Sequence, residues 1–389
     1  MSMSASRARS NALWTILSDA LDIPRSLYEQ AVARHKSFGR WLCRPGSALA
    51  DFGPRVHAQG GFRYGTVVKP IHTDAEYDLD NVVVLEKLHA VSLTQADLKQ
   101  RFGAEMAEYA AAHGMQPPTE KKRCWRLQYR DEVGFHLDSL PCVPAGAAIQ
   151  ETLRRARVPE SWATRAVAIT DQRHPQYLVI TQDWFTSNPR GFARWFESRA
   201  SLGRDAALLE QIRMGTVEPV PAYEWKTPLQ RCIQILKRHR DVHFVRAPTL
   251  APISMIITNL AAQAYQGETD VSDALLGIVR RMPNFVRAAA PFVPNPTHPA
   301  EDYADKWAHD ARLPQNFSAW HQQALADVER LSEPLAHIES ADIERRFRVP
   351  LMAADASRLA LGAPAVAVAP APRIVSAPAP WGGVTPRRP

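Results

Sequence analysis

The most informative stretch of the chain begins as Gln59-Gly60-Gly61-Phe62-Arg63-Tyr64-Gly65-Thr66 and, after a short linker, continues as Glu76-Tyr77-Asp78-Leu79-Asp80-Asn81-Val82-Val83-Val84-Leu85-Glu86. The first part predicts a glycine-rich turn, and the second predicts a strand that ends in a buried apolar run. Residues i and i+2 of a strand share one face, with Cα atoms roughly 7 Å apart, so Asp78 and Asp80 point to the same side. The stretch therefore predicts a place to hold a metal-bound triphosphate.

The two carboxylates suggest which ions such a site would take. Divalent cations in phosphoryl-transfer sites lie about 3.5 to 4 Å apart, a spacing that two carboxylates at alternate strand positions can bracket. Hard oxygen ligands suit Mg²⁺, with Mn²⁺ as the alternative ion. Glu76 obeys the same alternation, but it lies nearest the linker and can equally be a solvated strand end.

A second strand is predicted at Phe135-His136-Leu137-Asp138-Ser139-Leu140, with Pro141 limiting its continuation. Asp138 points to the face opposite Phe135 and Leu137. An aspartate in an apolar strand is costly to bury unless it is paired or binds a cation. Taken alone, Asp138 could equally be a hydrogen-bonded structural acid. With Asp78 and Asp80 it completes a three-carboxylate set that could hold two metal ions.

Composition limits the class of protein. With 389 residues and 46% hydrophobic content, the chain is long enough for two domains. It has no run approaching the ~20 apolar residues of a membrane span and no signal-peptide pattern, so we expect a cytoplasmic protein with no membrane partner. The four cysteines lie far apart, which favours reduced thiols over a zinc site. The net charge of +7 favours polyanionic ligands, although a solvated basic surface would explain it as well.

Hydrophobic spacing and capping residues predict the flanking elements. Ser10 could cap the first helix, Thr94 is followed by Asp97 as in a capping box, and Thr227 precedes Pro228 at a helix start. The predicted helices are 10–21, 24–42, 94–113, 189–200, 228–244, 252–262 and 318–345. A further strand is predicted over 124–129, and loops over 44–58 and 295–307, the latter entering a helix.

The 228–244 helix places cations beside its buried stripe. On a helical wheel, Arg240 falls inside the stripe and Lys237 on its flank, while Arg238 points away. Such cations either extend along their stems to solvent or reach into a cleft that holds an anion. Ser254, near the start of the next helix, could cap that helix or touch a phosphate.

Together these residues resemble the bacterial CD-NTases, nucleotidyltransferases related to cyclic GMP-AMP synthase and oligoadenylate synthase that act in CBASS anti-phage defence. The resemblance extends from about Gln59 to Trp307. It is carried by the glycine turn with Gly65-Thr66, Glu76-Tyr77-Asp78-Leu79-Asp80, Phe135-His136-Leu137-Asp138, the helix from Trp225 to Arg240, and Asn295-Pro296 with Ala304-Asp305-Lys306-Trp307.

The resemblance implies a fold of the α/β (α+β) class. A polymerase-β-like nucleotidyltransferase core with a mixed sheet would be joined to an α-helical C-terminal lobe of the oligoadenylate-synthase type, with nucleotides between them. We expect residues 1–218 to form the core with its N-terminal helices and 219–353 to form the helical lobe. The Gly/Pro cluster at 215–221 suggests the boundary. Residues 354–389, rich in Ala and Pro, read as a disordered tail.

The resemblance also implies roles for residues. Asp78, Asp80 and Asp138 would hold two Mg²⁺ ions, and Lys237 and Ser254 would contact the donor triphosphate. Gln59, Gly60 and Gly61 would form the nucleotide-binding turn. The family usually has Gly-Ser there, so Gly61 keeps the backbone N–H groups and gives up one hydroxyl. A hydrogen bond to a charged group is worth about 1.5–3 kcal/mol, which predicts a slower enzyme rather than an inactive one.

The implied activity is synthesis of a cyclic di- or trinucleotide second messenger from ATP or other NTPs, acting on a downstream effector. A HORMA-type regulatory protein or an activating nucleic acid could switch it on. Two alternatives remain open. One is a linear RNA- or protein-modifying nucleotidyltransferase. The other is a catalytically weak nucleotide or nucleic-acid sensor, which the missing serine and the basic charge would suit.

Overall fold

The structure is a computed structural model that describes residues 3–72, 76–129, 134–202, 226–332 and 340–359. Its helices are α1 Met3–Leu21, α2 Arg25–Leu42, α3 Gly60–Tyr64, α4 Gln95–Ala112, α5 Ala147–Arg155, α6 Glu160–Ala163, α7 Pro189–Ala200, α9 Pro228–His243, α10 Ser254–Ala264, α11 Val271–Arg281, α12 Arg312–Ser332, α13 Ser340–Phe347 and α14 Ala353–Arg358. Its strands are β1 Pro54–Gln59, β2 Tyr77–Leu85, β3 Thr119–Glu120, β4 Trp125–Tyr129, β5 Phe135–Pro144, β6 Val167–Ile169, β7 Phe185–Ser187, β8 Pro294–Asn295 and β9 His298–Asp302.

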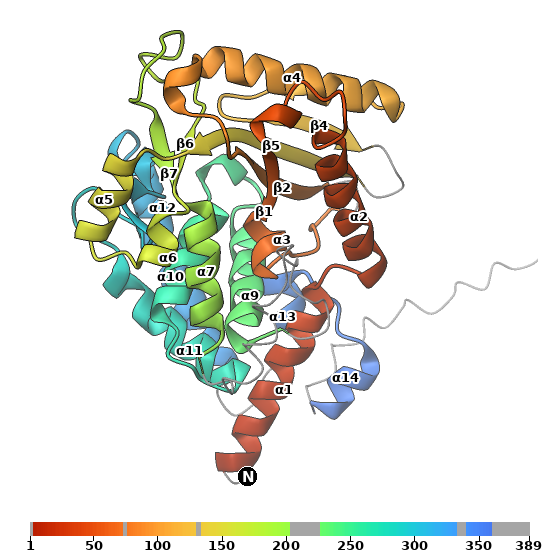
Figure 1. Cartoon of the computed structure of the whole chain (residues 1–389). Coiled ribbons are helices and arrows are strands. Elements are labelled where there is room, and N and C mark those ends of the chain that lie inside the picture. The colour runs from red at the N-terminus through yellow and green to blue at the C-terminus, as the bar shows by residue number, and fades with distance from the viewer. Residues whose placement is uncertain (1–2, 73–75, 130–133, 203–225, 333–339, 360–389) are drawn as a thin grey trace, which may run out of the picture.

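One mixed sheet lies at one end of the molecule, and a group of helices fills the other end (Figure 1). The strand order is β1-β2-β5-β4-β3, with β6 paired to β5 and β7 paired to β6. β2 and β5 run parallel, and the other pairs of this sheet are antiparallel. The predicted fold class, a mixed sheet combined with a helical part, is confirmed.

The apolar face of the sheet is covered by α2 and α4. Side chains that alternate with the acidic positions, such as Leu79 and Leu137, pack in one cluster with Phe38 of α2 and Phe102 of α4. The opposite face therefore remains for the polar side chains of the same strands, as the period-2 alternation requires.

The helical part has its own hydrophobic cluster, which includes two elements from earlier in the chain. Residues of α9, α10, α11 and α12 pack together with Trp14 and Leu17 of α1 and with Phe192 and Phe196 of α7. Figure 1 shows α1 and α7 beside α9 and α11. The predicted boundary between 218 and 219 lies outside the described residues and stays a prediction.

Local capping signals are confirmed. Thr94 and Asp97 form a capping box at α4, and Thr227 and Gln230 form one at α9, where Pro228 is the first helical residue. The strand predicted within 76–86 is β2, and the helix predicted at 189–200 is α7.

Several local predictions are wrong because a distant partner decides the structure. Ser10 lies inside α1, where its Oγ bonds Ser272 Oγ at 2.7 Å, instead of capping the helix. The predicted loop 44–58 contains most of β1, which pairs with β2. The sequence predicts that the segment 295–307 is a loop that enters a helix, but residues 294–302 form the β8–β9 hairpin.

Pro141 does not end β5, which continues to Pro144. Along one edge, β5 pairs with β4 up to Ser139 and with β6 from Cys142, so Pro141 falls between two partners. Its carbonyl faces that edge and accepts from Thr170 Oγ1 at 3.3 Å. The missing N–H of the proline therefore costs no ladder hydrogen bond.

At the C-terminal end, the predicted tail overlaps α14, whose following residue Leu359 is buried. Residues 360–389 lie outside the described part, where disorder stays a prediction. Among the described residues, no helix is both long and apolar enough to cross a membrane.

Candidate active site

Four side chains from adjacent strands form a row across the sheet. In the strand register, Gln59 of β1 pairs with Asp80 of β2, Asp80 with Asp138 of β5, and Asp138 with Arg126 of β4. Residues that pair across neighbouring strands point to the same face. The register thus places Asp80 and Asp138 side by side, as the sequence predicted, and adds Arg126 at the end of the row.

A second row lies two residues away and contains Asp78, His136 and Gln128. His136 Nε2 lies 2.9 Å from Asp78 Oδ1, and His136 Nδ1 lies 3.2 Å from Glu76 Oε2. Burial lowers the pKa of His136, but the hydrogen bond and charge of Asp78 outweigh it, so that the pKa is raised. The contact between Glu76 and His136 Nδ1 orients the imidazole ring so that Nε2 faces Asp78.

His136, like Arg126, is a residue of the site that the sequence analysis did not single out. Its signal was present, because His136 stands two positions before Asp138 on the same strand and must share its face. Ligand atoms of Asp78, His136 and Asp138 all lie within 4.8 Å of one another. That spacing fits a metal ion, and the carboxylate oxygens suit Mg²⁺ or Mn²⁺.

Asp138 is held by Arg126. The guanidinium Nε donates to Asp138 Oδ1 at 2.6 Å and Nη2 donates to Oδ2 at 2.7 Å. Such a bidentate pair is the strongest kind of hydrogen-bonded contact between an arginine and a carboxylate.

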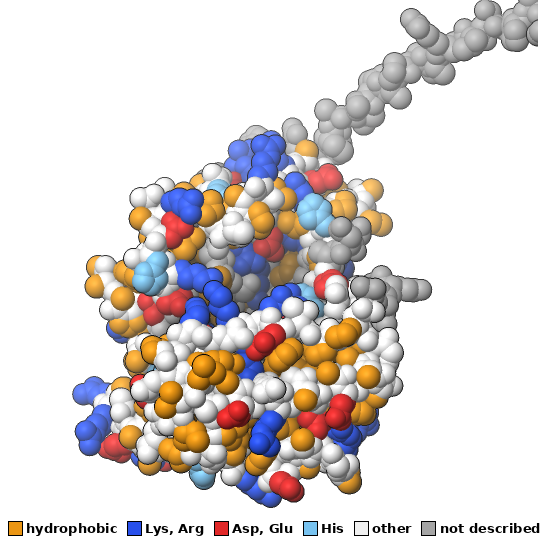
Figure 2. Space-filling view, turned by 90° about the horizontal axis from the view of Figure 1, so that it is seen from above, with side chains coloured by type: hydrophobic (Ala, Val, Ile, Leu, Met, Phe, Trp, Pro, Cys, Tyr) orange, Lys and Arg blue, Asp and Glu red, His pale blue; other side chains and the backbone are white. Residues whose placement is uncertain are grey.

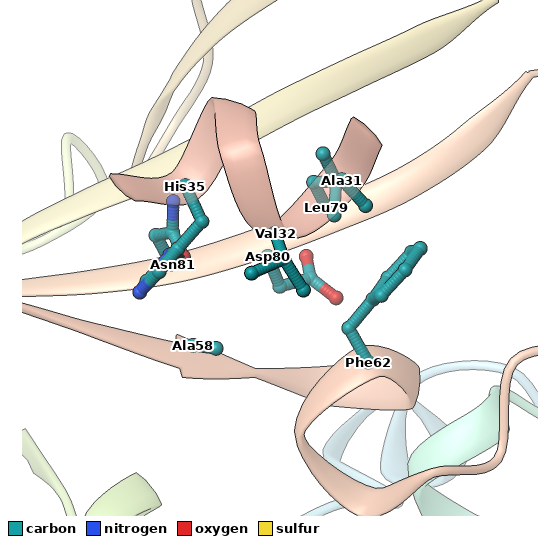
Figure 3. A pocket seen from close by; sticks show the side chains of 8 residues that line it. All are labelled: Ala31, Val32, His35, Ala58, Phe62, Leu79, Asp80 and Asn81. Atoms are coloured by element: carbon teal, nitrogen blue, oxygen red, sulfur yellow. Dashed lines mark hydrogen bonds between the residues drawn. The ribbon is translucent and has the colours of Figure 1, made fainter. Parts of the chain in front are cut away.

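The stretch predicted as a glycine-rich turn is the junction of β1 and the short helix α3, and Asp80 lies against Gly60, the first residue of that helix. Gly60 has a φ of +65°, and a Cβ built on it would stand 2.1 Å from Asp80 Oδ2. Figure 3 shows the Asp80 carboxylate pointing from β2 toward the helix that carries Phe62, and these two residues line one pocket with His35 and Asn81. Desolvation, together with the charges of Asp78 and Asp138, raises the pKa of Asp80 to about 8. Only a residue without a side chain fits at position 60.

The two residues predicted in the helical lobe have protein partners in this structure. Lys237 Nζ donates to Thr66 O at 3.1 Å and contacts Thr66 Oγ1 at 3.0 Å. Burial, with the charge of Arg240, lowers the pKa of Lys237 to about 7. Ser254 is the first residue of α10 and makes no capping bond; its Oγ accepts from Arg240 Nη1 at 3.1 Å.

One side of α9 holds the segment that follows α3. Side chains of α9 donate to four backbone carbonyls between the last residue of α3 and residue 69: Gln230 to Tyr64 at 2.8 Å, Lys237 to Thr66 at 3.1 Å, Gln234 to Val67 at 2.6 Å and Arg238 to Lys69 at 2.6 Å. Arg238 is therefore buried, which corrects the expectation that it points away. These contacts attach the glycine turn to the helical part.

The surface seen from above is hollowed between two masses of side chains, and Lys and Arg side chains gather along the hollow (Figure 2). Charge of one sign around a hollow raises the local concentration of ligands of the opposite sign. This arrangement favours an anionic ligand.

Comparison with known proteins gives two sequence relatives and a family domain. Residues 54–142 match the nucleotidyltransferase domain of the cyclic GMP-AMP synthase DncV-like family. The chain is 27% identical over 305 residues to a c-di-GMP synthase of Roseivirga ehrenbergii, covering 77% of this chain and 74% of the relative. It is 26% identical over 329 residues to the cyclic dinucleotide synthase CdnG of Bradyrhizobium diazoefficiens, covering 79% and 72%.

Solved structures support the same fold. The structure of B. diazoefficiens CdnG in complex with GTP matches with a TM-score of 0.64 at 20% identity, covering 90% of this chain and 98% of that one. A chain of the CdnC:HORMA-deltaN complex of E. coli MS115-1 matches with a TM-score of 0.55 at 11% identity, covering 88% of this chain and 97% of that one. DncV-like nucleotidyltransferases use divalent metals, and the Asp78, His136 and Asp138 group is a possible site for one.

Proposed function

The chain belongs to the bacterial CD-NTases, and from that premise we propose that it joins nucleoside triphosphates into a cyclic di- or trinucleotide that acts as a second messenger in anti-phage signalling. Pyrophosphate leaves at each step. The observation that carries this proposal is the pair of neighbouring rows on one sheet face, with Asp80 and Asp138 in one and Asp78 in the other.

Each site residue has a proposed role. Asp78, Asp80 and Asp138 would hold two Mg²⁺ ions, which supply charge neutralisation at the attacking hydroxyl and at the leaving pyrophosphate when bound. His136 orients the Asp78 carboxylate through its 2.9 Å contact. Gln59 pairs with Asp80, Gly60 packs against its carboxylate and Gly61 follows next in the chain, which suits a role of these residues in placing the triphosphate next to the carboxylates.

The helical lobe would supply the wall of the nucleotide site that lies opposite the carboxylates. Lys237 sits on α9 within bonding distance of Thr66, so its ammonium is already at the turn where a triphosphate would lie. Ser254, whose Oγ accepts from Arg240, offers a hydroxyl at the start of α10. Both are proposed to contact the donor phosphates, with Lys237 exchanging Thr66 for a phosphate oxygen.

Substrates and partners follow from the relatives. Both sequence relatives carry names of cyclic dinucleotide synthases, which favours a dinucleotide product, and the CdnG complex with GTP supports GTP, besides ATP, as a substrate. The CdnC:HORMA complex supports a HORMA-type protein as a candidate regulator, alongside an activating nucleic acid. The product would act on a downstream effector.

The test is incubation with radiolabelled NTPs and Mg²⁺ or Mn²⁺, followed by phosphatase and mass measurement. We expect phosphatase-resistant cyclic products, lost in Asp78→Ala and in Asp138→Asn. The proposal is wrong if no product forms even with candidate activators, or if the Asp78→Ala protein behaves like the wild type. Linear, primer-dependent products would instead identify a linear nucleotidyltransferase, and magnesium-independent nucleic-acid binding without turnover would identify a sensor.

A further inference from the structure

Arg126 and a metal ion would compete for the same two oxygen atoms. Arg126 stands opposite Asp138 in the β4–β5 register, and its guanidinium bonds both carboxylate oxygens, at 2.6 and 2.7 Å. Asp138 is also one of the three residues whose ligand atoms converge within 4.8 Å. The guanidinium occupies one lone pair of each oxygen, so a cation that coordinates Asp138 on that side of the carboxylate replaces at least one of the arginine bonds.

The ion pair between Arg126 and Asp138 is partly buried. The Asp138 side chain is 16% exposed and that of Arg126 is 34% exposed. A charge pair in such partly desolvated surroundings is screened far less than one on the open surface. Arg126 nevertheless reaches solvent, so its guanidinium can leave Asp138 without becoming buried and unpaired.

The arginine also offsets a repulsion within the site. Asp78 and Asp138 both act on Asp80, and like charges this close destabilise one another. In the absence of a metal ion, a protein cation on Asp138 and the imidazole on Asp78 reduce that repulsion. The acidic rows can thus persist in the folded protein without a bound ion.

We propose that Arg126 is a positioning residue that holds Asp138 when no nucleotide is bound, and that it couples metal binding to nucleotide binding. Free metal alone has to displace the guanidinium at a cost. Metal that arrives with a triphosphate brings anionic oxygens with which the released guanidinium can pair. This inference rests on the proposed function, because it concerns the same metal site.

The test measures Mn²⁺ binding to the nucleotide-free protein by electron paramagnetic resonance of free Mn²⁺. Arg126→Gln should bind Mn²⁺ about tenfold to a hundredfold more tightly than the wild type, the range expected for hydrogen bonds to a charged group. Arg126→Lys keeps the positive charge but cannot donate two parallel hydrogen bonds, so its Mn²⁺ affinity should lie between those of the wild type and Arg126→Gln. Arg154→Gln removes an equal charge from the exposed ion pairs that Arg154 of α5 makes with Glu151 and Glu160, and should match the wild type.

A second measurement addresses the coupling. Addition of a non-hydrolysable NTP should tighten Mn²⁺ binding more in the wild type than in Arg126→Gln, because the variant has no guanidinium to release. Mn²⁺ should also raise the melting temperature of Arg126→Gln more than that of the wild type, because the variant contains carboxylates that no arginine neutralises.

A folded Arg126→Gln protein that binds Mn²⁺ no more tightly than the wild type would overturn the inference. If this variant does not fold, Arg126→Lys decides, and wild-type Mn²⁺ affinity in that variant would overturn it. Failure of the proposed function is a separate outcome. It would appear as absent cyclic products in the wild type, whatever the Mn²⁺ affinities of the variants.

Discussion

Gly60 and Gly61 are neighbours under different constraints. Gly60 has a left-handed backbone, and a Cβ there would meet Asp80 Oδ2 at 2.1 Å. Gly61 has no such φ, and its Cβ would approach the Val67 Cγ2 methyl at 3.2 Å, a contact that a small shift relieves. A side chain at position 60 would therefore strain the backbone and displace Asp80. A methyl group at position 61 would only press against Val67.

Alanine at these two positions should separate the constraints. Gly60→Ala should lower the rate of product formation on the order of a hundredfold, since displacing Asp80, one of the proposed metal-binding carboxylates, by about 1 Å should have that effect. A left-handed alanine should also cost about 1–2 kcal/mol of unfolding free energy. Gly61→Ala is the matched control and should stay within a few-fold of wild type. Equal rates in the two variants, measured alongside urea unfolding, would contradict this interpretation of the turn.

Lys237 predicts a pH dependence of nucleotide binding. Burial lowers its pKa to about 7, and a triphosphate favours the charged ammonium. Nucleotide binding therefore raises the pKa and takes up a proton, so affinity is full below pH 7 and falls above it. We expect up to about a tenfold loss between pH 7 and 8 from this group.

Lys237→Gln removes this titration and leaves that of the carboxylates in place. The ratio of the Kd of the variant to that of the wild type should therefore be largest at pH 6 and shrink toward pH 8, measured by calorimetry with a non-hydrolysable NTP. A ratio that stays constant over this range would show that Lys237 does not change its protonation on binding.

For single residues, the sequence predicts which side chains share a face of the same strand, because side chains alternate along a strand. Asp78 and Asp80 share a face for that reason. The contacts of Arg126 and His136 depend on which strands are neighbours and on their register, and neither is contained in the spacing of a single strand. For the same reason the sequence could not predict that Gly60 packs on Asp80.

At the scale of elements, α9 holds the segment 64–69 through side chains rather than through apolar packing alone. Gln234 is fully buried, and its amide donates to Val67 O at 2.6 Å and to Asp22 Oδ1 at 3.2 Å. Gln234→Ala would leave both acceptors without this donor. Losing a buried hydrogen-bond partner costs about 1–3 kcal/mol.

We expect Gln234→Ala to lose that much unfolding free energy and also to raise KM for NTPs, because Thr66 lies in the loosened segment. Gln95→Ala is the control, since this glutamine at the start of α4 is also fully buried and its amide oxygen accepts from Asp171 N at 2.9 Å. That variant should lose stability without a change in KM. A Gln234→Ala enzyme with wild-type KM would show that the segment is positioned by other contacts.

Elements fixed by nearby residues were predictable, and elements fixed by distant partners were not. The capping boxes at α4 and α9 depend on residues three positions apart, which the sequence displays directly. β1 and the β8–β9 hairpin exist because another strand pairs with them. β5 runs through Pro141 because its partner changes there.

At the scale of the molecule, the chain passes repeatedly between two hydrophobic clusters. α1 packs in the helical cluster, α2 in the sheet cluster and α7 in the helical cluster again. The short helix α3 contributes to both, with Phe62 in the sheet cluster and Tyr64 in the helical cluster. An apolar stripe shows that a helix is buried but not against which core, so the sequence could not assign α1 and α7 to the helical cluster.

This arrangement predicts that the described parts of the chain unfold together. Trp14 of α1 and Phe38 of α2 are both fully buried, one in each cluster. Each change to alanine should cost roughly 3–5 kcal/mol. If the clusters unfold as one unit, Trp14→Ala and Phe38→Ala shift the same single transition, seen alike by tryptophan fluorescence and far-ultraviolet circular dichroism. If the lobes were independent, each variant would shift only its own transition and leave the other in place, so the pair of variants distinguishes one cooperative body from two.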